Sequence, residues 1–338
     1  MENELEEIIM GKNGSREGLR KLAIELSSTD SSDSARAAFL SSIHVRGETP
    51  EEIEGFSYGI LSLSTLGQFR DCSDIVGTGG DRKGTINVST AASLVCSSLG
   101  IRIGKHGNRS ITGKFGSADF MEACGYKFDM EKEEVIKRLK EDNFVFILAP
   151  MYNASFRSFS EVRKKLGHPT IFNIMGPITN PLNPSRAVVG STTTEIQNTL
   201  ARVMALRGMK GYSIRSEDGM DEISTNGLSS LLEVRGEIKE HMVDGSRISG
   251  RRVDDANIMA QSREKILSLT LSGLKGENPD AASFIALNAA PCILLNRITD
   301  SLESAYKLAM SAIQNGKAFS TLVNITGGKA REVLSIVS

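Results

Sequence analysis

Residues 76–90, VGTGGDRKGTINVST, hold four glycines between two apolar stretches. The run DIVG at 74–77 precedes them and the helix-like ASLVCSSLG at 92–100 follows. A glycine-rich turn between a strand and a helix is typical of parallel α/β sheets, and it can be no more than a tight connection. Glycines also let the backbone approach a ligand, and the N–H groups at a helix start bind phosphate. The stretch matches neither the Walker pattern nor the GxGxxG fingerprint.

The same pattern of short apolar runs followed by turns and helical segments recurs along the rest of the chain. Short apolar runs that predict strands occur at 101–104, 144–150, 187–191 and 211–214, and residues 230–243 predict a hairpin turning at Arg235-Gly236. Residues 279–295 predict a buried helix, whereas residues 1–67 predict short capped helices and no strand. The sequence therefore predicts an α/β protein with a small N-terminal helical domain and a larger α/β domain whose sheet is mostly parallel.

Composition limits the classes of function. The 338 residues include 40 Lys and Arg against 41 Asp and Glu, so no overall positive field attracts nucleic acid or anionic lipid. The four cysteines are scattered without CxxC spacing, which indicates neither zinc nor disulfides and suits the cytoplasm. The start MENELEE is acidic and does not resemble a signal peptide, and the apolar run 144–151 is too short to cross a bilayer.

A second glycine-rich segment, KHGNRSITGKFGSAD at 105–119, follows the next predicted strand and carries Lys105, His106, Asn108, Arg109 and Lys114. Taken alone it could be a solvated basic loop. Two glycine-rich loops that follow strands of one parallel sheet nevertheless lie at its carboxyl edge, where α/β proteins bind their ligands. Two phosphate cradles predict a ligand with more than one phosphate.

Two further segments carry side chains that could bind a metal ion and a carboxylate. The turn SEDGMDEIS at 216–224 places Asp221 and Glu222 where both can reach a hydrated Mg²⁺, and no His or Cys that would favour zinc is nearby. Residues 156–184 predict a basic helix followed by a long loop, and Arg163 on that helix could bind a carboxylate with two parallel hydrogen bonds. A solvated loop and a solvated basic face are the alternatives for these two segments.

The ordered set of segments resembles the anthranilate phosphoribosyltransferases. It comprises GTGGD at 77–81, NVST at 87–90, KHGNR at 105–109, GKxGSAD at 113–119, VRKxLG at 162–167, TIFNxxGPxxNP at 170–181 and the DE pair at 221–222. The resemblance covers nearly the full chain. It implies the fold of the nucleoside phosphorylases and phosphoribosyltransferases, a homodimer, and Mg²⁺. It also implies transfer of the phosphoribosyl group from 5-phosphoribosyl 1-pyrophosphate to the amine of anthranilate, the second step of tryptophan synthesis from chorismate.

The resemblance also assigns residues by position. Those implied for phosphoribosyl pyrophosphate are Gly77, Gly80, Asp81, Thr85, Asn87, Val88, Ser89, Thr90, Lys105, His106, Gly107, Asn108, Arg109, Ser110, Ile111, Thr112, Gly113 and Ser117. Those implied for anthranilate are Gly77, Asn108 and Arg163, and those for Mg²⁺ are Ser89, Asp221 and Glu222. No dedicated acid or base is expected, because the amine of anthranilate is already a neutral nucleophile.

The expected domains are residues 1–67, with a contribution from about 160–184, and residues 68–338. The sequence departs from the family on the acceptor side. Asn153-Ala154-Ser155 stands where the family usually has His-Pro-Ala, and Pro169 stands where it usually has Arg. These changes bear on the choice of acceptor rather than on the phosphate donor.

Two other functions remain open at this point. A pyrimidine nucleoside phosphorylase shares the domain plan and a glycine-rich phosphate loop, but it needs no acidic metal pair. A nucleic-acid-binding relative without catalysis would need a basic face, and the balanced charge gives no sign of one.

Overall fold

The computed structural model of the chain describes residues 2–79, 83–109 and 115–337. Its N-terminal part is helical, as predicted, with α1 (Glu2–Ile9), α2 (Arg16–Ser27), α3 (Asp33–Arg46) and α4 (Pro50–Ser62). The side chains of Ser15, Ser32 and Thr49 cap the last three of these helices by accepting a backbone N–H bond. Thr49 and Glu52 complete a reciprocal capping box in front of α4, where Pro50 takes the first helical position.

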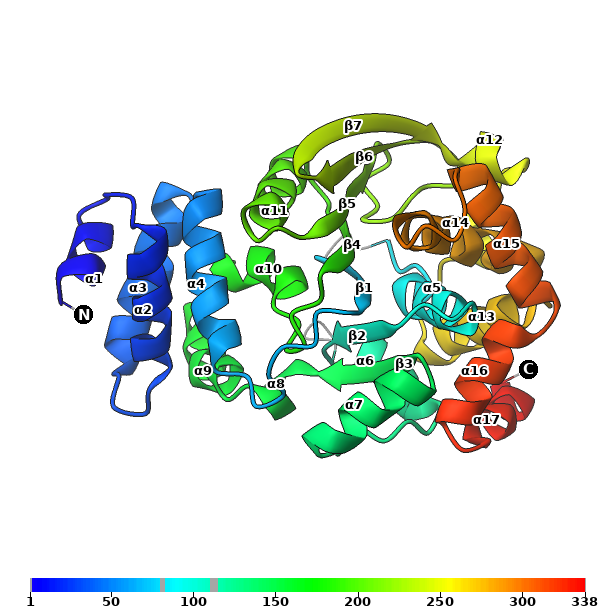
Figure 1. The fold of residues 1–338 in the computed structure, drawn as a ribbon, viewed down its shortest axis with the longest axis horizontal. Coiled ribbons are helices and arrows are strands. Elements are labelled where there is room, and N and C mark those ends of the chain that lie inside the picture. Colours follow the sequence, from blue (N-terminus) through cyan, green and yellow to red (C-terminus); the bar gives the residue numbers. More distant parts are fainter. Residues whose placement is uncertain (1, 80–82, 110–114, 338) are drawn as a thin grey trace.

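A seven-stranded sheet forms the centre of the remaining chain, in the order β3-β2-β1-β4-β5-β6-β7 (Figure 1). Its strands are β1 (Ser73–Gly77), β2 (Ile103–Gly107), β3 (Phe144–Leu148), β4 (Arg186–Gly190), β5 (Lys210–Ser216), β6 (Leu228–Arg235) and β7 (Glu237–Asp244). The first five pair in parallel, whereas β5–β6 and β6–β7 pair antiparallel. The predictions of a mostly parallel sheet and of a hairpin turning at Gly236 are confirmed, and Gly236 has a φ of 89°.

The strand order places a topological switch point between β1 and β4. From β1 the chain builds β2 and β3 on one side, and it then returns to add β4 and β5 on the other side. Ligands of open α/β sheets bind at the carboxyl ends of the strands at such a point. Gly77 and Gly190 end β1 and β4 as a matched pair, so they mark the place where a ligand site is expected.

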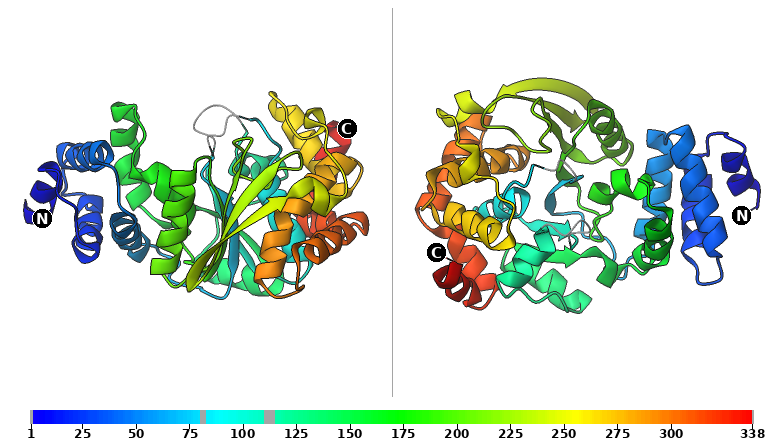
Figure 2. Two further views of the ribbon diagram at one scale, coloured as in Figure 1. Left: turned by 90° about the horizontal axis from the view of Figure 1, so that it is seen from above. Right: turned by 180° about the vertical axis from the view of Figure 1, so that it is seen from behind.

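Helices cover both faces of the sheet (Figure 2). One face packs on α5 (Val88–Ser98), α6 (Ser117–Ala123), α13 (Arg263–Lys275), α14 (Pro279–Leu295), α15 (Leu302–Gln314), α16 (Lys317–Ile325) and α17 (Lys329–Val337). On the other face α11 (Thr194–Leu206) packs on β5 and β6, and it shares one core with α9 (Ser155–Leu166), α10 (Ile171–Met175) and the N-terminal helices. Successive residues of β4 alternate between these two cores, Val188 in the first and Val189 in the second, as the pleat of a strand requires.

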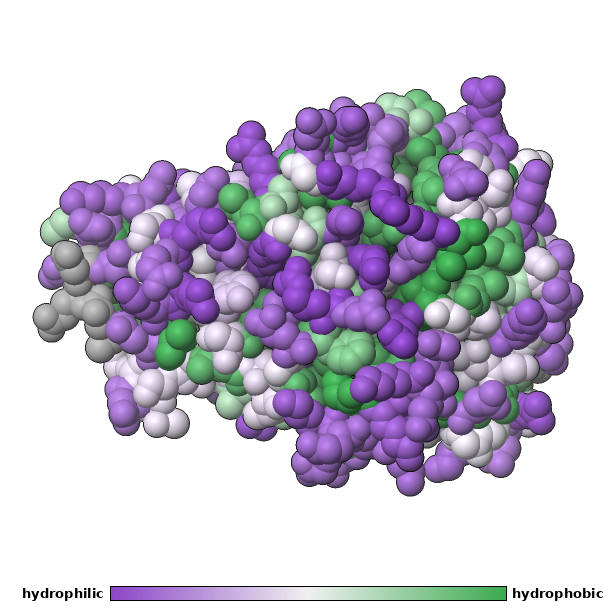
Figure 3. Space-filling model, in the orientation of Figure 1, coloured by the Kyte–Doolittle hydropathy of each residue, from purple (hydrophilic) through white to green (hydrophobic). Residues whose placement is uncertain are grey.

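Short helices complete the described chain: α7 (Lys132–Glu141), α8 (Ala149–Tyr152), η1 (Gly176–Ile178), α12 (Gly245–Ser249) and η2 (Asp255–Asn257). The long loop predicted after the basic helix is therefore partly wrong, because α10 and η1 lie within it. Among the described helices, none combines the length and the apolar character needed to span a bilayer. On the face drawn in Figure 3, hydrophilic residues predominate and hydrophobic residues show in separate areas.

Candidate active site

The first of two adjoining pockets lies at the carboxyl ends of β1, β4 and β5 and has a volume of about 230 Å³. Its wall includes the turn after β1, the start of α5 and the acidic turn after β5. It brings together eight of the residues predicted for donor and metal: Gly77, Thr85, Asn87, Val88, Ser89, Ser117, Asp221 and Glu222. The site therefore lies at the switch point of the sheet.

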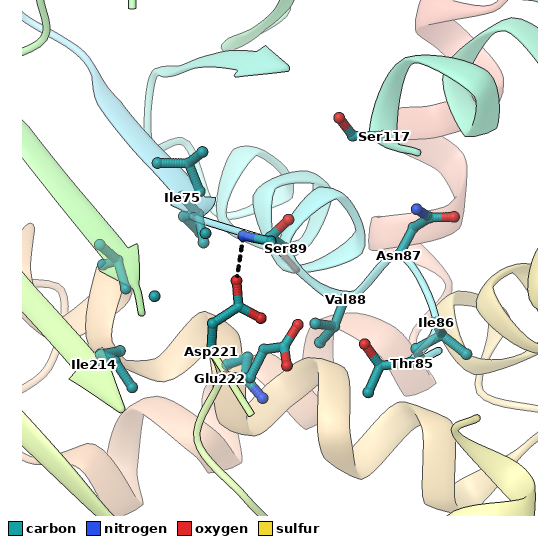
Figure 4. A pocket seen from close by; sticks show the side chains of 16 residues that line it. Ile75, Thr85, Ile86, Asn87, Val88, Ser89, Ser117, Ile214, Asp221 and Glu222 are labelled. Carbon is teal, nitrogen blue, oxygen red and sulfur yellow. Dashed lines mark hydrogen bonds between the residues drawn. The ribbon is translucent and has the colours of Figure 1, made fainter. Parts of the chain in front are cut away.

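The acidic turn packs tightly against the glycine-rich turn. Oδ2 of Asp221 accepts a hydrogen bond from the backbone N–H of Gly79 at 2.8 Å, and this bond is drawn in Figure 4. A Cβ atom at Gly77 would lie 2.2 Å from Oδ2 of Asp221, and one at Gly190 would lie 1.7 Å from the carbonyl oxygen of Asp221. Glycine is therefore needed at both strand ends so that Asp221 can reach the pocket.

The oxygen atoms in this pocket fit Mg²⁺. Figure 4 shows Asp221 and Glu222 side by side, pointing into the pocket toward Ser89. The described residues contain no group of three or more His, Cys, Asp and Glu side chains that could hold a metal alone. Mg²⁺ does not need such a cage, since it usually takes one or two carboxylates and completes its shell with water and substrate phosphate. Two carboxylates and the Ser89 hydroxyl therefore suit a magnesium ion shared with a phosphorylated ligand.

Two buried polar atoms beside the pockets have no hydrogen-bond partner within the described residues. Asn87 is the residue before the helix, yet its side chain makes no capping hydrogen bond. Its Nδ2 donates to the carbonyl oxygen of Phe115 at 3.2 Å, whereas its buried Oδ1 has no partner within the described residues. The buried hydroxyl oxygen of Thr78 is also without a partner there. Buried polar atoms left unbonded are costly, so these atoms indicate that a ligand or water completes the site.

The second pocket, of about 290 Å³, shares Val76, Gly77, Ser89 and Ser117 with the first. It brings together a further set of predicted residues: Lys105, His106, Gly107, Asn108 and Arg163. The rest of its wall comes from Thr78, Ala149, α9, α10 and the turn at 176–179. The two pockets are thus halves of one site that meet at the end of β1.

Arg163 reaches the second pocket from α9 and is held by its neighbours. Its Nε donates to the hydroxyl of Thr170 at 3.1 Å and its Nη2 to Oδ1 of Asn173 at 3.5 Å. Its guanidinium lies over the ring of Phe172, 4.9 Å from the centroid. Burial lowers the pKa of Arg163 from its ordinary value. An arginine pre-oriented beside an aromatic ring in a partly dry pocket can pair strongly with a carboxylate.

The structure corrects the prediction that residues 105–119 form a loop from Lys105 onward. Strand β2 continues to Gly107, and the side chain of Lys105 is buried. Nζ of Lys105 donates to the carbonyl oxygen of Ile75 at 2.6 Å, and burial lowers the pKa of Lys105 to about 8. A buried ammonium at the wall of the second pocket is a strong attraction for an anion.

Both ring nitrogens of His106 contact oxygen atoms within the protein. Nδ1 of its ring lies 2.5 Å from Oδ2 of Asp74, and Nε2 lies 2.9 Å from the carbonyl oxygen of Gly176. Asn180 also donates to Oδ2 of Asp74, at 2.8 Å. The ring is held between the carboxylate of Asp74 and the carbonyl oxygen of Gly176, so His106 fixes the Gly176 turn at the edge of the second pocket. Its predicted contact with the donor remains a prediction.

We expect His106→Leu to lower the free energy of unfolding by about 3 kcal/mol, since it removes the hydrogen-bond partner that the ring gives to the buried carboxylate of Asp74. Urea unfolding followed by circular dichroism measures this loss. His241→Leu is the matched control: it removes a half-exposed histidine 3.0 Å from Glu233, and its effect should stay within about 0.5 kcal/mol. Unchanged stability of His106→Leu with a raised KM for the donor would point instead to direct contact with the donor.

Other predicted residues lie elsewhere. Arg109 lines neither pocket, and its guanidinium pairs with Glu122, the Nη2 contact being 2.8 Å. Thr90 is buried on α5 and lines neither pocket. Six predicted residues lie outside the described part of the chain: Gly80, Asp81, Ser110, Ile111, Thr112 and Gly113.

Asn153, which replaces the family's usual histidine, is a buried structural residue here. Its Nδ2 donates to the carbonyl oxygen of Ile60 in α4 at 2.7 Å, and its Oδ1 accepts from the N–H of Ser155 at 3.0 Å. It lines neither pocket. Asn153 therefore ties the end of α4 to the start of α9, the helix that carries Arg163.

The aromatic wall of the second pocket was missed by sequence reasoning. Phe156 and Phe172 both line it. Phe156 lies seven residues before Arg163, which places the two side chains on one face of α9 two turns apart. That spacing is a signal that could have identified Phe156, whereas the position of Phe172 depends on how α10 packs.

Comparison with known proteins agrees with this geometry. Residues 70–319 match the glycosyl transferase family, a/b domain. An anthranilate phosphoribosyltransferase of Picrophilus torridus is 47% identical over 88% of this chain and 91% of its own. An anthranilate phosphoribosyltransferase of Thermoplasma acidophilum is 39% identical over 96% of this chain and 99% of its own.

Solved structures give the same fold. The anthranilate phosphoribosyltransferase of Thermus thermophilus superposes with a TM-score of 0.89 at 29% identity, over 97% of this chain and 99% of its own. The enzyme of Saccharomyces cerevisiae, solved in complex with PRPP and Mg, superposes with a TM-score of 0.82 at 24% identity, over 94% of each chain.

Proposed function

Since the chain belongs to the anthranilate phosphoribosyltransferases, within the glycosyl transferase family with an a/b domain, we propose that its two pockets hold the two substrates of that reaction. The enzyme transfers the phosphoribosyl group of 5-phosphoribosyl 1-pyrophosphate to the amine of anthranilate. The products are N-(5-phosphoribosyl)anthranilate and pyrophosphate. One observation carries the proposal: a pocket with an acidic pair adjoins a pocket with Arg163 and two aromatic rings.

The first pocket is assigned to the pyrophosphate end of the donor. Ser89, Asp221 and Glu222 would hold Mg²⁺ there, and the bound ion would neutralise charge on the leaving pyrophosphate. The start of α5 lines the same pocket, and N–H groups of its first turn would bind the same anion. As the bond from C1 of the ribose to pyrophosphate breaks, negative charge grows on the leaving group, and fixed donors stabilise that state more than the ground state.

The part of the second pocket around Arg163, Phe156 and Phe172 is assigned to anthranilate, whereas Lys105 in the same pocket is assigned to the donor. Arg163 would bind its carboxylate, and Phe156 and Phe172 would flank its ring. This contact fixes the direction of the amine toward the shared wall at Gly77 and Ser89, where the ribose would lie. Alignment of the two substrates supplies much of the rate, and the neutral amine needs no dedicated base.

The remaining assignments follow the same resemblance. We propose a homodimer in the cytoplasm that binds neither nucleic acid nor membrane, with residues 1–67 and part of 160–184 forming a helical domain beside residues 68–338. In support, residues 159–178 pack in one core with the N-terminal helices. The relatives favour this function over a pyrimidine nucleoside phosphorylase or a non-catalytic nucleic-acid-binding protein.

A fluorescence assay of anthranilate consumption tests the proposal. We expect consumption only when phosphoribosyl pyrophosphate and Mg²⁺ are both present, and EDTA should abolish it. Thymidine with inorganic phosphate is the control for the phosphorylase reaction and should give no thymine. Anthranilate left unchanged under all conditions would overturn the assignment.

The lowered pKa of Lys105 leads us to expect that donor binding depends on pH. Its pKa of about 8 in the empty protein should rise when phosphate binds nearby, so binding takes up a proton above pH 8. Donor affinity should then fall by up to about tenfold per pH unit between pH 8 and 9.5. The empty protein should show the opposite trend, gaining stability between pH 8 and 10.5, because its unfolded state binds more protons there.

Calorimetric titration with the donor in two buffers of different ionisation enthalpy measures how many protons the protein takes up on binding. Lys105→Met is the control, because it keeps the length of the side chain and removes the charge. The assignment of Lys105 to the donor is contradicted if the native protein binds the donor without proton uptake at pH 9.

A further inference from the structure

A third cavity, of about 450 Å³, lies far from the candidate active site in the fold. It opens between α2, α4 and the segments that precede β1 and β5. Arg70 comes just before β1, and Arg207 lies between α11 and β5, so the cavity is at the amino-terminal edge of the sheet. The candidate active site is at the opposite, carboxyl edge.

Positive charge dominates this cavity. Four arginines line it, Arg16, Arg20, Arg70 and Arg207, against the two carboxylates of Glu17 and Glu54. Both carboxylates have cationic neighbours of their own: Glu54 lies 2.8 Å from Nε of Arg16, and Glu17 lies 3.6 Å from Lys21. Three guanidinium groups are therefore left without a carboxylate partner within the described residues.

These three groups are placed differently. Arg20 lies over the ring of Tyr58, 4.4 Å from its centroid. Arg70 is exposed and its side chain makes no hydrogen bond within the described residues. Arg207 lies deepest, and its terminal nitrogens donate to the hydroxyl of Ser57 and to the carbonyl oxygen of Ile178.

Arg207 is the most strongly desolvated cation of this cavity. Its buried Nε has no hydrogen-bond partner in the described chain. Burial lowers the pKa of Arg207 to about 10, and although Glu54 opposes this shift, the charges of Arg70 and Arg16 add to it. A buried cation beside two other cations is costly, and an anion in the cavity would offset the repulsion between them.

We propose that this cavity binds a small phosphorylated metabolite through its phosphate dianion. Guanidinium groups match phosphate oxygens with paired hydrogen bonds, and three of them face the same space. The volume exceeds what inorganic phosphate alone requires and falls in the range of small-ligand pockets. Because Arg20 belongs to α2 and Arg70 and Arg207 to the body around the sheet, the ligand would join the N-terminal helices to that body.

A tryptophan reporter tests the proposal, because the sequence contains no tryptophan. In the full-length Tyr58→Trp variant, sodium phosphate at constant ionic strength should change the fluorescence with saturation, and sodium chloride should not. Arg70→Gln in the same background should weaken phosphate binding by about tenfold, as loss of one charged hydrogen-bond donor predicts. Arg252→Gln is the matched control, because Arg252 is also exposed but lies outside the cavity.

Thermal unfolding of the chain without the reporter is the second measurement. Phosphate should raise the unfolding midpoint of the parent and of Arg252→Gln by the same amount, and that of Arg70→Gln by less. Phosphate that binds only at the donor pocket would stabilise all three equally. That result, or a reporter signal that does not saturate or that is unchanged by Arg70→Gln, would overturn the proposal.

Discussion

Replacement of Asp221 by Asn together with Glu222 by Gln is expected to lower kcat/KM by about a thousandfold or more, with the fold retained. Both side chains face the pocket that holds Ser89, and the change removes two negative charges without changing shape. An amide oxygen at position 221 can still accept the N–H of Gly79, so the glycine-rich turn should keep its position. The loss should therefore come from metal binding and not from misfolding.

The same turn supplies the matched control. Glu217 and Asp218 are exposed neighbours that line neither pocket, so their Gln and Asn variants should keep nearly full activity. Circular dichroism reports the fold, and the electron paramagnetic resonance of Mn²⁺ in the presence of donor reports the metal directly. An undiminished magnesium-dependent rate in the double variant, or unchanged Mn²⁺ binding, would remove Asp221 and Glu222 from the metal site.

The sheet could be predicted because each strand carries its signal locally. Short apolar runs located the strands β1 to β5, and Arg235-Gly236 located the hairpin, since a turn with positive φ favours glycine. The strand order was not predicted, because it depends on which helices pack on which face. That order brings the ends of β1 and β4 together at the site.

The error at β2 has a physical cause. Lys105 and His106 were assigned to a loop because charged side chains are rarely buried. Their partners are the carbonyl of Ile75 and the carboxylate of Asp74, which lie about 30 residues earlier in the chain. A buried polar residue can be recognised only with its partner, and a single sequence does not show which residues are paired. Phe172 was missed because its place in the pocket wall depends on how α10 packs.

Arg163→Gln is expected to raise KM for anthranilate about a hundredfold while KM for the donor changes little. A hydrogen bond to a charged partner contributes about 1.5–3 kcal/mol, and the guanidinium can make two of them to one carboxylate. Neither contact of Arg163 inside the protein uses its Nη1, so this nitrogen remains to bind the substrate. Arg163→Lys should recover only part of the affinity, because an ammonium keeps the charge but cannot make two parallel hydrogen bonds to one carboxylate.

Aniline separates binding of the carboxylate from general damage to the pocket, because it has the ring and amine of anthranilate without the carboxylate. If Arg163 holds the carboxylate, Arg163→Gln should weaken turnover of anthranilate strongly and turnover of aniline hardly at all. Arg157→Gln is the matched control: Arg157 is exposed on the same helix and lines neither pocket, so KM should be unchanged. Equal losses with both acceptors would show that Arg163 only supports the wall around Phe172, and the carboxylate would then need another partner.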